Sequence, residues 1–309
     1  MDPTTDVVTG SFGYIGRYIT DRLLNKGRLV KTITTHTDKP NPFGSSVAAF
    51  PYDFDHPDRL VETLRGVDRL YNTYWIRFNH SGLTFEQAVD NTGILFRCAK
   101  EAGVRKIVHI SVTNASEDSD LPYYAGKALQ ENLLRESGLA YSIIRPTLVF
   151  GREDILVNNI AWLIRKIPFF PIPGDGSYKL QPISVEDLAS IAVGHGQTDS
   201  SNESDAIGPE TYTYEEFVRL TASTIGRKVT FIHIPSSLSI LLGKVIGLFL
   251  RDVILTKNEL RGLMDEYLTS PEPPTGPTLY SEWVEKYKES IGFAYSSELS
   301  RHFRWSKPG

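Results

Sequence analysis

The sequence predicts an α/β protein with a doubly wound parallel sheet and a smaller C-terminal lobe. Three observations carry this prediction. Short apolar runs alternate with segments of helical periodicity through the first half of the 309-residue chain. A glycine-rich turn joins the first apolar run to the first helical segment. The second half is less regular, and we interpret its Pro- and Gly-rich stretches at 168–176 and 271–277 as loops.

Six short apolar strands are expected in the first half, with helices between them. The strands cover 6–9, 29–35, 48–52, 68–74, 106–111 and 141–145. Helices are expected at 14–26, 84–102 and 123–137, and each is followed by a glycine that can end a helix. Strand–helix units at this density imply right-handed crossovers and therefore a parallel sheet.

The chain is expected to divide into two domains. Residues 1–150 would form the dinucleotide-binding core, and residues 151–309 would form most of a substrate-binding lobe. Short returns of the chain to the central sheet are expected near 181–183 and 206–208, so the core also draws on the region 181–207.

The composition excludes several classes of protein. The chain has 33 Lys+Arg, 37 Asp+Glu and 40% hydrophobic residues, which indicates a folded, mildly acidic globule. A net charge of −4 argues against broad nucleic-acid binding, which needs a concentrated basic surface. Cys98 is the one cysteine, so no intrachain disulfide can form, and its helical neighbours favour a core thiol. The histidines lack metal-ligand spacing, so no metal site is expected.

Two segments of the sequence indicate where in the cell the protein is expected to be found. Residues 1–6 have neither the basic nor the apolar region of a signal peptide, so a cytoplasmic location is expected. The most apolar window, 236–256, is interrupted by Lys244, and a membrane-spanning helix is therefore not expected. Burial of this window in the C-terminal lobe is favoured over contact with a membrane surface.

The most informative motif is TGSFGYIG at 9–16, between the first strand and the first helix. Gly10 permits the tight turn, Gly13 lets the backbone approach a pyrophosphate, and Gly16 lets the helix lie close to the sheet. The helix N-terminus then presents N–H groups to the phosphates. The pattern predicts a Rossmann dinucleotide site, the alternative being a merely structural turn. Its expected cofactor-binding residues are Gly10, Ser11, Phe12, Gly13, Tyr14, Ile15 and Gly16.

The choice between NAD and NADP is expected to depend on the end of the second strand. An acidic residue there would bind the ribose hydroxyls of NAD, but this chain has Thr-Thr-His-Thr at 34–37. The missing carboxylate slightly favours NADP(H) over NAD(H). We expect Thr35, His36 and Lys39 to contact the cofactor, with Arg17 as a further cation, although Lys39 and Arg17 can equally be solvated surface charges.

Two further pairs of residues lie near the carboxyl ends of strands. Asp53 and Phe54 follow the third strand, where they could hold and cover the adenine; the alternative is a cap for the helix that starts near Pro57. Asn72 and Thr73, in the fourth strand, are also assigned to the cofactor site.

The candidate catalytic pair is Tyr123 and Lys127, which lie one turn apart on one helix face. A phenol with a pKa near 10 is a poor acid or base at neutral pH unless a cation favours the phenolate, and Lys127 can supply that cation. Ser111 and Thr113, at the end of the fifth strand, could hold a substrate oxygen. The alternative is an ordinary pair on a helix surface.

Together, TGSFGYIG, the strand-end Ser and Thr, and YYAGK at 123–127 resemble the short-chain dehydrogenase/reductase superfamily. RPTLVFG at 145–151 and QPISVEDLA at 181–189 resemble signatures of its extended and atypical branches, which include nucleotide-sugar epimerases and dehydratases. The segments HISVTNASED, RPTLVFGRED and PIPGDG are closest in pattern to the short-chain-dehydrogenase-like accessory subunits of respiratory complex I.

The resemblance implies a role for each matching residue. Tyr123 would be the general acid/base, and Lys127 would bind the nicotinamide ribose and lower the pKa of Tyr123. Thr113, or less favourably Ser111, would polarise the substrate. The residues on the nicotinamide side would be Arg145, Pro146 and Thr147.

The expected function is therefore that of an NAD(P)(H)-dependent oxidoreductase or epimerase/dehydratase-type enzyme acting on a small carbonyl or hydroxyl compound. Two departures count against a nucleotide-sugar substrate: SVTNASED lacks the Tyr-Gly of those enzymes, and YNTYW at 71–75 replaces their apolar-Ala-Ala. The alternatives are a non-catalytic NADP(H)-binding protein of a membrane complex, associated with that complex or with the membrane surface, and an NADP(H)-responsive redox sensor.

Overall fold

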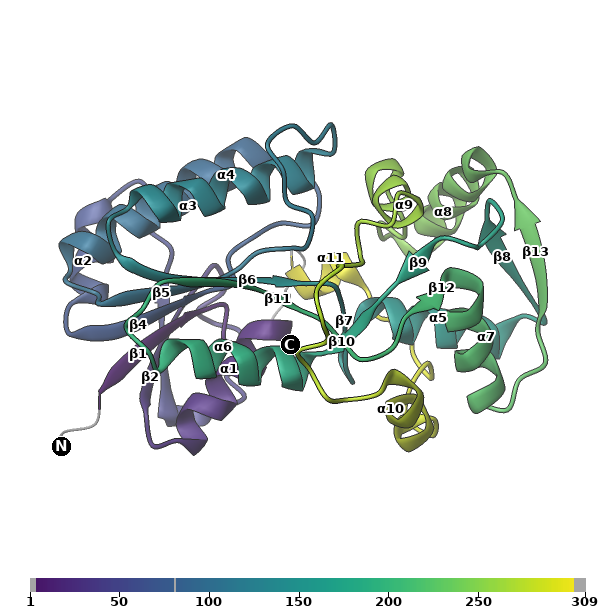
Figure 1. The fold of residues 1–309 in the computed structure, drawn as a ribbon, viewed down its shortest axis with the longest axis horizontal. Helices are drawn as coiled ribbons and strands as arrows, with labels where there is room; N and C mark the ends of the chain where they lie inside the picture. Colours follow the sequence, from purple (N-terminus) through teal and green to yellow (C-terminus); the bar gives the residue numbers. More distant parts are fainter. Residues whose placement is uncertain (1–3, 81, 303–309) are drawn as a thin grey trace. The chain divides into compact units, whose positions relative to one another are not determined.

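The computed structural model describes residues 4–80 and 82–302, so the first three residues of the segment examined for a signal peptide lie outside it. The chain divides into two compact units (Figure 1). Unit 1 comprises residues 1–146 and 188–205, and unit 2 comprises residues 147–187 and 206–309. Each unit is described by itself below.

Unit 1 is built on a sheet of seven strands, in the order β11-β6-β5-β4-β1-β2-β3. The strands are β1 (Thr5–Thr9), β2 (Leu29–Thr34), β3 (Val47–Pro51), β4 (Val67–Asn72), β5 (Lys106–Ile110), β6 (Ala140–Pro146) and β11 (Asn202–Ala206). Strands β1 to β6 pair in parallel throughout. The order reverses at β1, which confirms the predicted doubly wound sheet and places its switch point between β1 and β4.

Helices cover both faces of this sheet (Figure 1). α1 (Tyr14–Asn25) and α6 (Val185–Gly196) lie on one face; α2 (Pro57–Leu64), α3 (Phe85–Glu101) and α4 (Pro122–Glu136) lie on the other. A 3-10 turn, η1 (Gly44–Ser46), precedes β3. Val7, Leu70 and Ile107 on the central strands are fully buried, as expected of strands covered on both faces.

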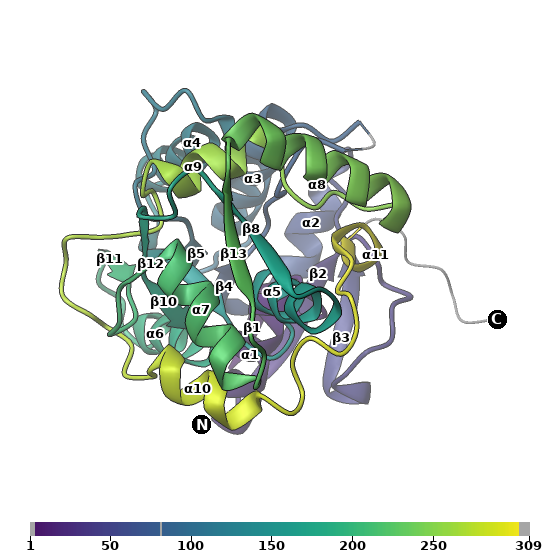
Figure 2. The same ribbon diagram turned by 90° about the vertical axis from the view of Figure 1, so that its right-hand side faces the viewer.

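Among its described residues, unit 2 contains three short two-stranded sheets and the remaining helices (Figure 2). Its strands are β7 (Leu148–Phe150), β8 (Phe169–Pro173), β9 (Lys179–Leu180), β10 (Pro182–Ser184), β12 (Tyr212–Thr213) and β13 (Thr230–Ile234). Its helices are α5 (Ile155–Lys166), α7 (Tyr214–Thr224), α8 (Ser236–Leu250), α9 (Lys257–Met264), α10 (Tyr280–Tyr287) and α11 (Glu298–His302). Phe150, Phe217 and Tyr280 form the centre of its core.

The interpretation of 168–176 as a loop is wrong, because β8 occupies most of it and pairs in parallel with β13. The N–H of Gly174 donates to the carbonyl of Ile234, so even-numbered N–H groups point toward β13. Pro171 and Pro173 therefore fall on the unpaired edge, where a missing N–H costs no ladder bond.

The expected return of 181–183 to the central sheet is also wrong, because β10 pairs with β7 instead. The returning strand is β11, whose sequence NESDA ends at Ala206, where the predicted return at 206–208 only begins. This edge strand is only partly buried, so it lacks the apolar signal that marks the central strands.

The window 236–256 contains α8, and the expectation that it is buried fails for one face of that helix. Leu248 is 79% exposed and Phe249 is 82% exposed. Within the described residues, no helix combines the length and apolar character needed to cross a membrane.

Candidate functional site

The glycine-rich loop connects β1 to α1 in unit 1. Gly10 has φ of +67°, a conformation that other residues adopt only with strain. A Cβ at Gly16 would lie 2.8 Å from the carbonyl carbon of Gly10, so α1 approaches the loop more closely than any side chain allows. Gly13 is the N-cap of α1, supplies no side-chain cap, and is followed by a first turn without acidic residues. The helix N-terminus is therefore arranged to attract an anion.

Of the other predicted residues of the loop, one is bonded to neighbouring elements and three are half-buried. Ser11 is fully buried; its N–H donates to Thr32 Oγ1 over 3.0 Å, and its hydroxyl accepts from Thr20 Oγ1 over 2.8 Å. Ser11 thus fixes the loop to β2 and α1. The remaining members of the predicted set are half-buried at the start of α1: Phe12, Tyr14 and Ile15.

The segment after β2 carries the residues predicted to choose between NAD and NADP. Thr35 is exposed, whereas His36 and Lys39 are half-buried. The N–H of His36 donates to Thr34 Oγ1 over 3.3 Å, and the N–H of Lys39 donates to the carbonyl of His36 over 3.3 Å. The turn therefore places an imidazole and an ammonium at the carboxyl end of β2, without a carboxylate at 35–37.

Asp53 and Phe54 follow β3, but Asp53 is already engaged. Its carboxylate contacts His56 Nδ1 at 2.7 Å and Arg59 at 3.0 Å, and the bond to His56 keeps the pKa of Asp53 below its ordinary value. The N-cap of α2 is His56, so Asp53 does not cap that helix. The contact of Asp53 with an adenine stays a prediction. Phe54 stacks on Tyr52 with ring centres 5.1 Å apart.

Asn72 and Thr73 end β4 and join it to its neighbours. The N–H of Thr73 donates to Thr9 Oγ1 over 2.7 Å, and Thr73 Oγ1 donates to the carbonyl of Thr9 over 2.6 Å. The amide of Asn72 contacts His109 Nδ1 at 3.0 Å, and burial lowers the pKa of His109 well below its ordinary value. These residues hold the carboxyl ends of β1, β4 and β5 in register beneath the glycine loop.

Tyr123 and Lys127 come together around Trp75. The indole of Trp75 meets the half-buried Tyr123 edge to face, with ring centres 5.8 Å apart. Lys127 Nζ lies 4.9 Å from the centre of the Trp75 ring and donates to the carbonyl of Ile110 over 2.8 Å. A Cβ at Gly126 would lie 2.5 Å from Trp75 Cη2, so the indole fits against α4 only because residue 126 is glycine.

The ammonium of Lys127 is poorly solvated. The side chain is buried, and this burial lowers its pKa to about 7, although nearby Glu131 acts in the opposite direction. At neutral pH, Lys127 is therefore protonated in only part of the molecules. Lys127 can therefore supply the predicted positive charge beside Tyr123 in only that part of the molecules.

The two hydroxyls predicted to polarise a substrate are both buried. Ser111 Oγ donates to Glu131 Oε1 over 2.6 Å. Thr113 Oγ1 lies 3.4 Å from the carbonyl oxygen of Pro146, which also accepts from the N–H of Thr113 over 3.1 Å. These partners are protein groups that hold β5, β6 and α4 together.

The three residues predicted on the nicotinamide side also bond within the protein. Arg145 donates to Glu131 over 2.8 Å and 2.6 Å and to Glu203 over 2.5 Å. Hydrogen bonds from Arg135 and Arg145 hold the pKa of Glu203 at about 2. Pro146 is buried in unit 1, and the N–H of Thr147 donates to the carbonyl of Ala206 within unit 2.

The sequence analysis did not identify Glu131 or Glu203, and it predicted no contact between Trp75 and the helix of Tyr123 and Lys127. The sequence could have indicated Glu131, because Lys127, Glu131 and Arg135 are spaced four residues apart and therefore lie on one face of α4. Trp75 and Glu203 carry no such signal, since each reaches α4 or β6 from a distant part of the chain. Cys98 is buried in the core, as predicted.

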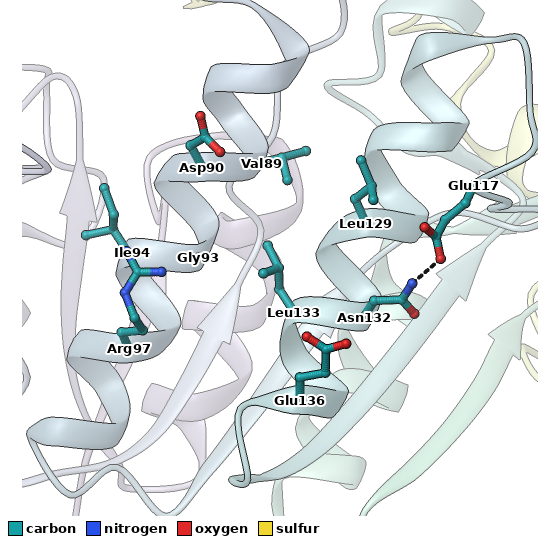
Figure 3. Close-up of a pocket in the computed structure, with 10 residues that line it drawn as sticks. All are labelled: Val89, Asp90, Gly93, Ile94, Arg97, Glu117, Leu129, Asn132, Leu133 and Glu136. Atoms are coloured by element: carbon teal, nitrogen blue, oxygen red, sulfur yellow. Dashed lines mark hydrogen bonds between the residues drawn. The ribbon is translucent and has the colours of Figure 1, made fainter.

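A groove of about 450 Å³ lies between α3 and α4 (Figure 3). Gly93 and Leu133 lie at its centre, and Asn132 donates a hydrogen bond to Glu117 at one side. None of the predicted site residues lines it. It is therefore separate from the site at the carboxyl edge of the sheet.

Comparison with known proteins agrees with this geometry. Residues 10–155 match a family described as NAD(P)H-binding. The chain is 24% identical over 282 residues to the mitochondrial NADH-ubiquinone oxidoreductase 40 kDa subunit of Neurospora crassa, covering 88% of this chain and 73% of that one. It spans 61% and 60% of the length of related mitochondrial subunits from Dictyostelium discoideum and Arabidopsis thaliana.

Two solved structures have a similar fold. MoeE5, in complex with UDP-glucose and NAD, has a TM-score of 0.69 and 18% identity, covering 93% of this chain and 97% of that one. The triphenylmethane reductase of Citrobacter sp., complexed with NADP(H), has a TM-score of 0.67 and 18% identity, covering 93% and 100%. The predicted Rossmann fold is thereby confirmed. The match over residues 10–155 indicates NAD(P)H binding, and the comparisons together agree with the resemblance to the extended short-chain dehydrogenase/reductase branch.

Proposed function

We propose that this chain, an NAD(P)H-binding protein of the extended short-chain dehydrogenase/reductase type, holds its nucleotide as a structural group within a protein assembly. The observation that carries the proposal is Lys127. Its ammonium is buried, donates to the carbonyl of Ile110 and lies against Trp75. A lysine enclosed in this way, and only partly protonated at neutral pH, is poorly placed to stabilise a phenolate at Tyr123.

The nucleotide would lie at the carboxyl edge of the unit 1 sheet. The uncapped start of α1 would hold the pyrophosphate, and Gly10 and Gly16 would allow its close approach. His36 and Lys39 would face the adenosine ribose, where the ammonium of Lys39 favours NADP(H) over NAD(H), although the carboxylate of Asp38 lies beside it in the chain. In enzymes of this type, the bound nicotinamide supplies or accepts a hydride.

Three features support a role without turnover. The hydroxyls of Ser111 and Thr113 are buried against protein groups, so substrate contact would require each to change partners. Lys127 has a pKa of about 7, which weakens its influence on Tyr123. The Neurospora crassa relative is named as a subunit of NADH-ubiquinone oxidoreductase, and by analogy the partner of this chain would be a protein assembly.

One observation favours a second candidate function, that of an oxidoreductase acting on a small carbonyl or hydroxyl compound. Tyr123 is half-buried, Lys127 is one turn away on α4, and both contact Trp75. In this candidate, Trp75 would turn aside when the nicotinamide ribose reaches Lys127. Tyr123 would then transfer the proton that accompanies hydride transfer.

A comparison of wild type with Tyr123→Phe separates the two functions. Calorimetric titration should show that both bind NADPH with equal affinity, because the lost hydroxyl is not needed to hold the nucleotide. Under the proposal, NADPH bound to either protein keeps its absorbance when a panel of aldehydes, ketones and quinones is added. Oxidation that is at least about tenfold slower in Tyr123→Phe would establish catalysis and overturn the proposal.

A further inference from the structure

Helix α8 presents a continuous apolar face to solvent. Among the described residues, six of its large apolar side chains are at least 37% exposed, at the spacing of one helix face. They are Leu238, Leu241, Leu242, Val245, Leu248 and Phe249. Figure 2 shows α8 directly after β13, along the edge of unit 2. An apolar stripe of this length normally faces a core, so its exposure requires an explanation.

The opposite face of α8 explains why the large residues are not needed for packing. Its buried residues are small: Ser239, Gly243 and Gly247. A Cβ at Gly247 would lie 2.5 Å from the carbonyl oxygen of Asp252, because the chain turns sharply after the helix and returns along it. Unit 2 thus packs against the small face and leaves the large side chains outside.

The segment that contains α8 carries charged side chains of one sign. The chain carries a net charge of −4, yet no Asp or Glu occurs from Phe217 to Arg251. Lys244 and Arg251 are exposed. The next acid, Asp252, is buried, where it accepts from the hydroxyl of Tyr295 over 2.6 Å and from the N–H of Leu299 over 2.9 Å. The surface of α8 is therefore apolar with a basic border.

Lys244 lies at the edge of the apolar face. With about 100° of rotation per residue, it falls between the exposed stripe and the buried small residues. A long cationic side chain at this position can extend to phosphate groups while its methylenes stay against apolar surface. Lys244 and Arg251 also line a groove of about 470 Å³ with Leu248, Ile254 and Leu255. The lining of that groove is mainly apolar, with two cationic side chains and the buried, hydrogen-bonded Asp252.

We propose that α8 docks on an anionic lipid bilayer, with its apolar face in the acyl region and Lys244 and Arg251 at the phosphates. Because no described helix can cross the bilayer, α8 would lie in the plane of its surface. Charge selects this occupant: a negative lipid surface complements the basic border, whereas a second copy would bring like charges together. The proposal is independent of nucleotide binding.

Vesicle flotation with the full chain tests the proposal. Wild type should bind vesicles of phosphatidylcholine with about 30 mol% phosphatidylserine at least tenfold more tightly than vesicles of phosphatidylcholine alone. The double variant Leu248→Asp with Phe249→Asp should lose binding to both. Lys244→Gln with Arg251→Gln should lose only the preference for phosphatidylserine.

The matched control is Leu29→Asp with Leu129→Asp, which makes the same charge change at two exposed leucines of unit 1. This control should bind vesicles like wild type, and all variants should keep the wild-type melting transition. Failure of wild type to bind either kind of vesicle would overturn the proposal. Equal loss of binding in the control would also overturn it, as would self-association of wild type that the α8 double variant abolishes.

Discussion

At the carboxyl edge of unit 1 and at the α8 face of unit 2, the burial of side chains is the opposite of what the sequence pattern predicts. The edge carries the polar motifs of a catalytic site, yet Lys127, Ser111 and Thr113 are buried and bonded to protein groups. Helix α8 carries the pattern of a core helix, yet Leu248 and Phe249 are exposed. This contrast shows that residue type and spacing define one face of a helix or strand, whereas tertiary packing decides what covers that face.

The largest expected effect concerns the pH dependence of stability. Lys127 has a pKa of about 7 in the folded chain and an ordinary value of 10.5. The unfolded chain therefore binds more protons between these values, so the contribution of Lys127 to stability rises with pH across that window. The free energy of unfolding of wild type, relative to Lys127→Met, should rise by on the order of 4 kcal/mol from pH 7 to pH 10.5. Denaturant titrations measure this difference in unfolding free energy. If it did not change with pH, Lys127 would be solvated, and the carboxyl edge of unit 1 would not differ from α8 in burial as described.

Gly16→Ala should cause the next largest loss. The added Cβ would lie 2.8 Å from the carbonyl carbon of Gly10 and 3.0 Å from the carbonyl oxygen of Thr9, and these backbone atoms can move only by displacing the loop. We expect a loss of about 3 kcal/mol in stability and at least tenfold in NADPH affinity. Gly194→Ala on α6 is the control, because a Cβ there meets nothing within 4 Å. Equal NADPH affinity in wild type and Gly16→Ala would exclude the glycine loop as the site.

Gly126→Ala should test the contact between Trp75 and α4. The new methyl group would meet Trp75 Cη2 at 2.5 Å, so we expect a loss of about 2 kcal/mol. In a Trp75→Ala background, the same substitution should cost much less, since the clash is gone. A double-mutant cycle measured by chemical denaturation checks this coupling. Additive effects would show that the indole does not pack on residue 126.

Glu203 should contribute a smaller, acid-sensitive stabilisation. Its pKa is held at about 2, below the ordinary 4.5, by Arg135 and Arg145. This stabilisation is therefore present above pH 4.5 and is lost as the pH falls toward 2. We expect Glu203→Gln to cost about 1 kcal/mol at pH 7, because solvent partly screens the pair, and much less near pH 2. A cost that does not change with pH would show that the ion pairs contribute nothing.

The smallest effect should come from α8. Leu248→Asp with Phe249→Asp places two carboxylates on side chains that are 79% and 82% exposed, so unfolding should change by no more than about 0.5 kcal/mol. Thermal denaturation without lipid measures this. A loss above about 2 kcal/mol would mean that the face packs within the protein, and the comparison of the two regions would fail.

Much of unit 1 could be predicted from sequence because its signals are local. Buried parallel strands are continuous apolar runs, and Gly10, Gly13 and Gly16 follow from backbone geometry at a single turn. Tyr123 and Lys127 were placed correctly on one helix face. The contacts that Trp75 makes with them were not predictable, because they depend on the segment after β4 meeting α4 at Gly126, far along the chain.

Unit 2 was harder to predict because its signals conflict. The prolines of β8 favour a loop unless their alternation is read as the free edge of a strand. The apolar stripe of α8 fits a buried helix equally well, and only the spacing of Gly243 and Gly247 indicates which face is inside. The edge strand β11 has no apolar pattern, so its pairing with β6 follows from tertiary structure alone.

The proposal of a structural nucleotide depends on Lys127 being enclosed and only partly charged at neutral pH. An NMR pH titration of the lysine side-chain nitrogens, assigned with Lys127→Met, tests this most directly. Lys127 should titrate with a pKa of about 7, because burial removes its side chain from water. A pKa at or above the ordinary lysine value of 10.5 would show a solvated, permanent cation beside Tyr123 and would contradict the account.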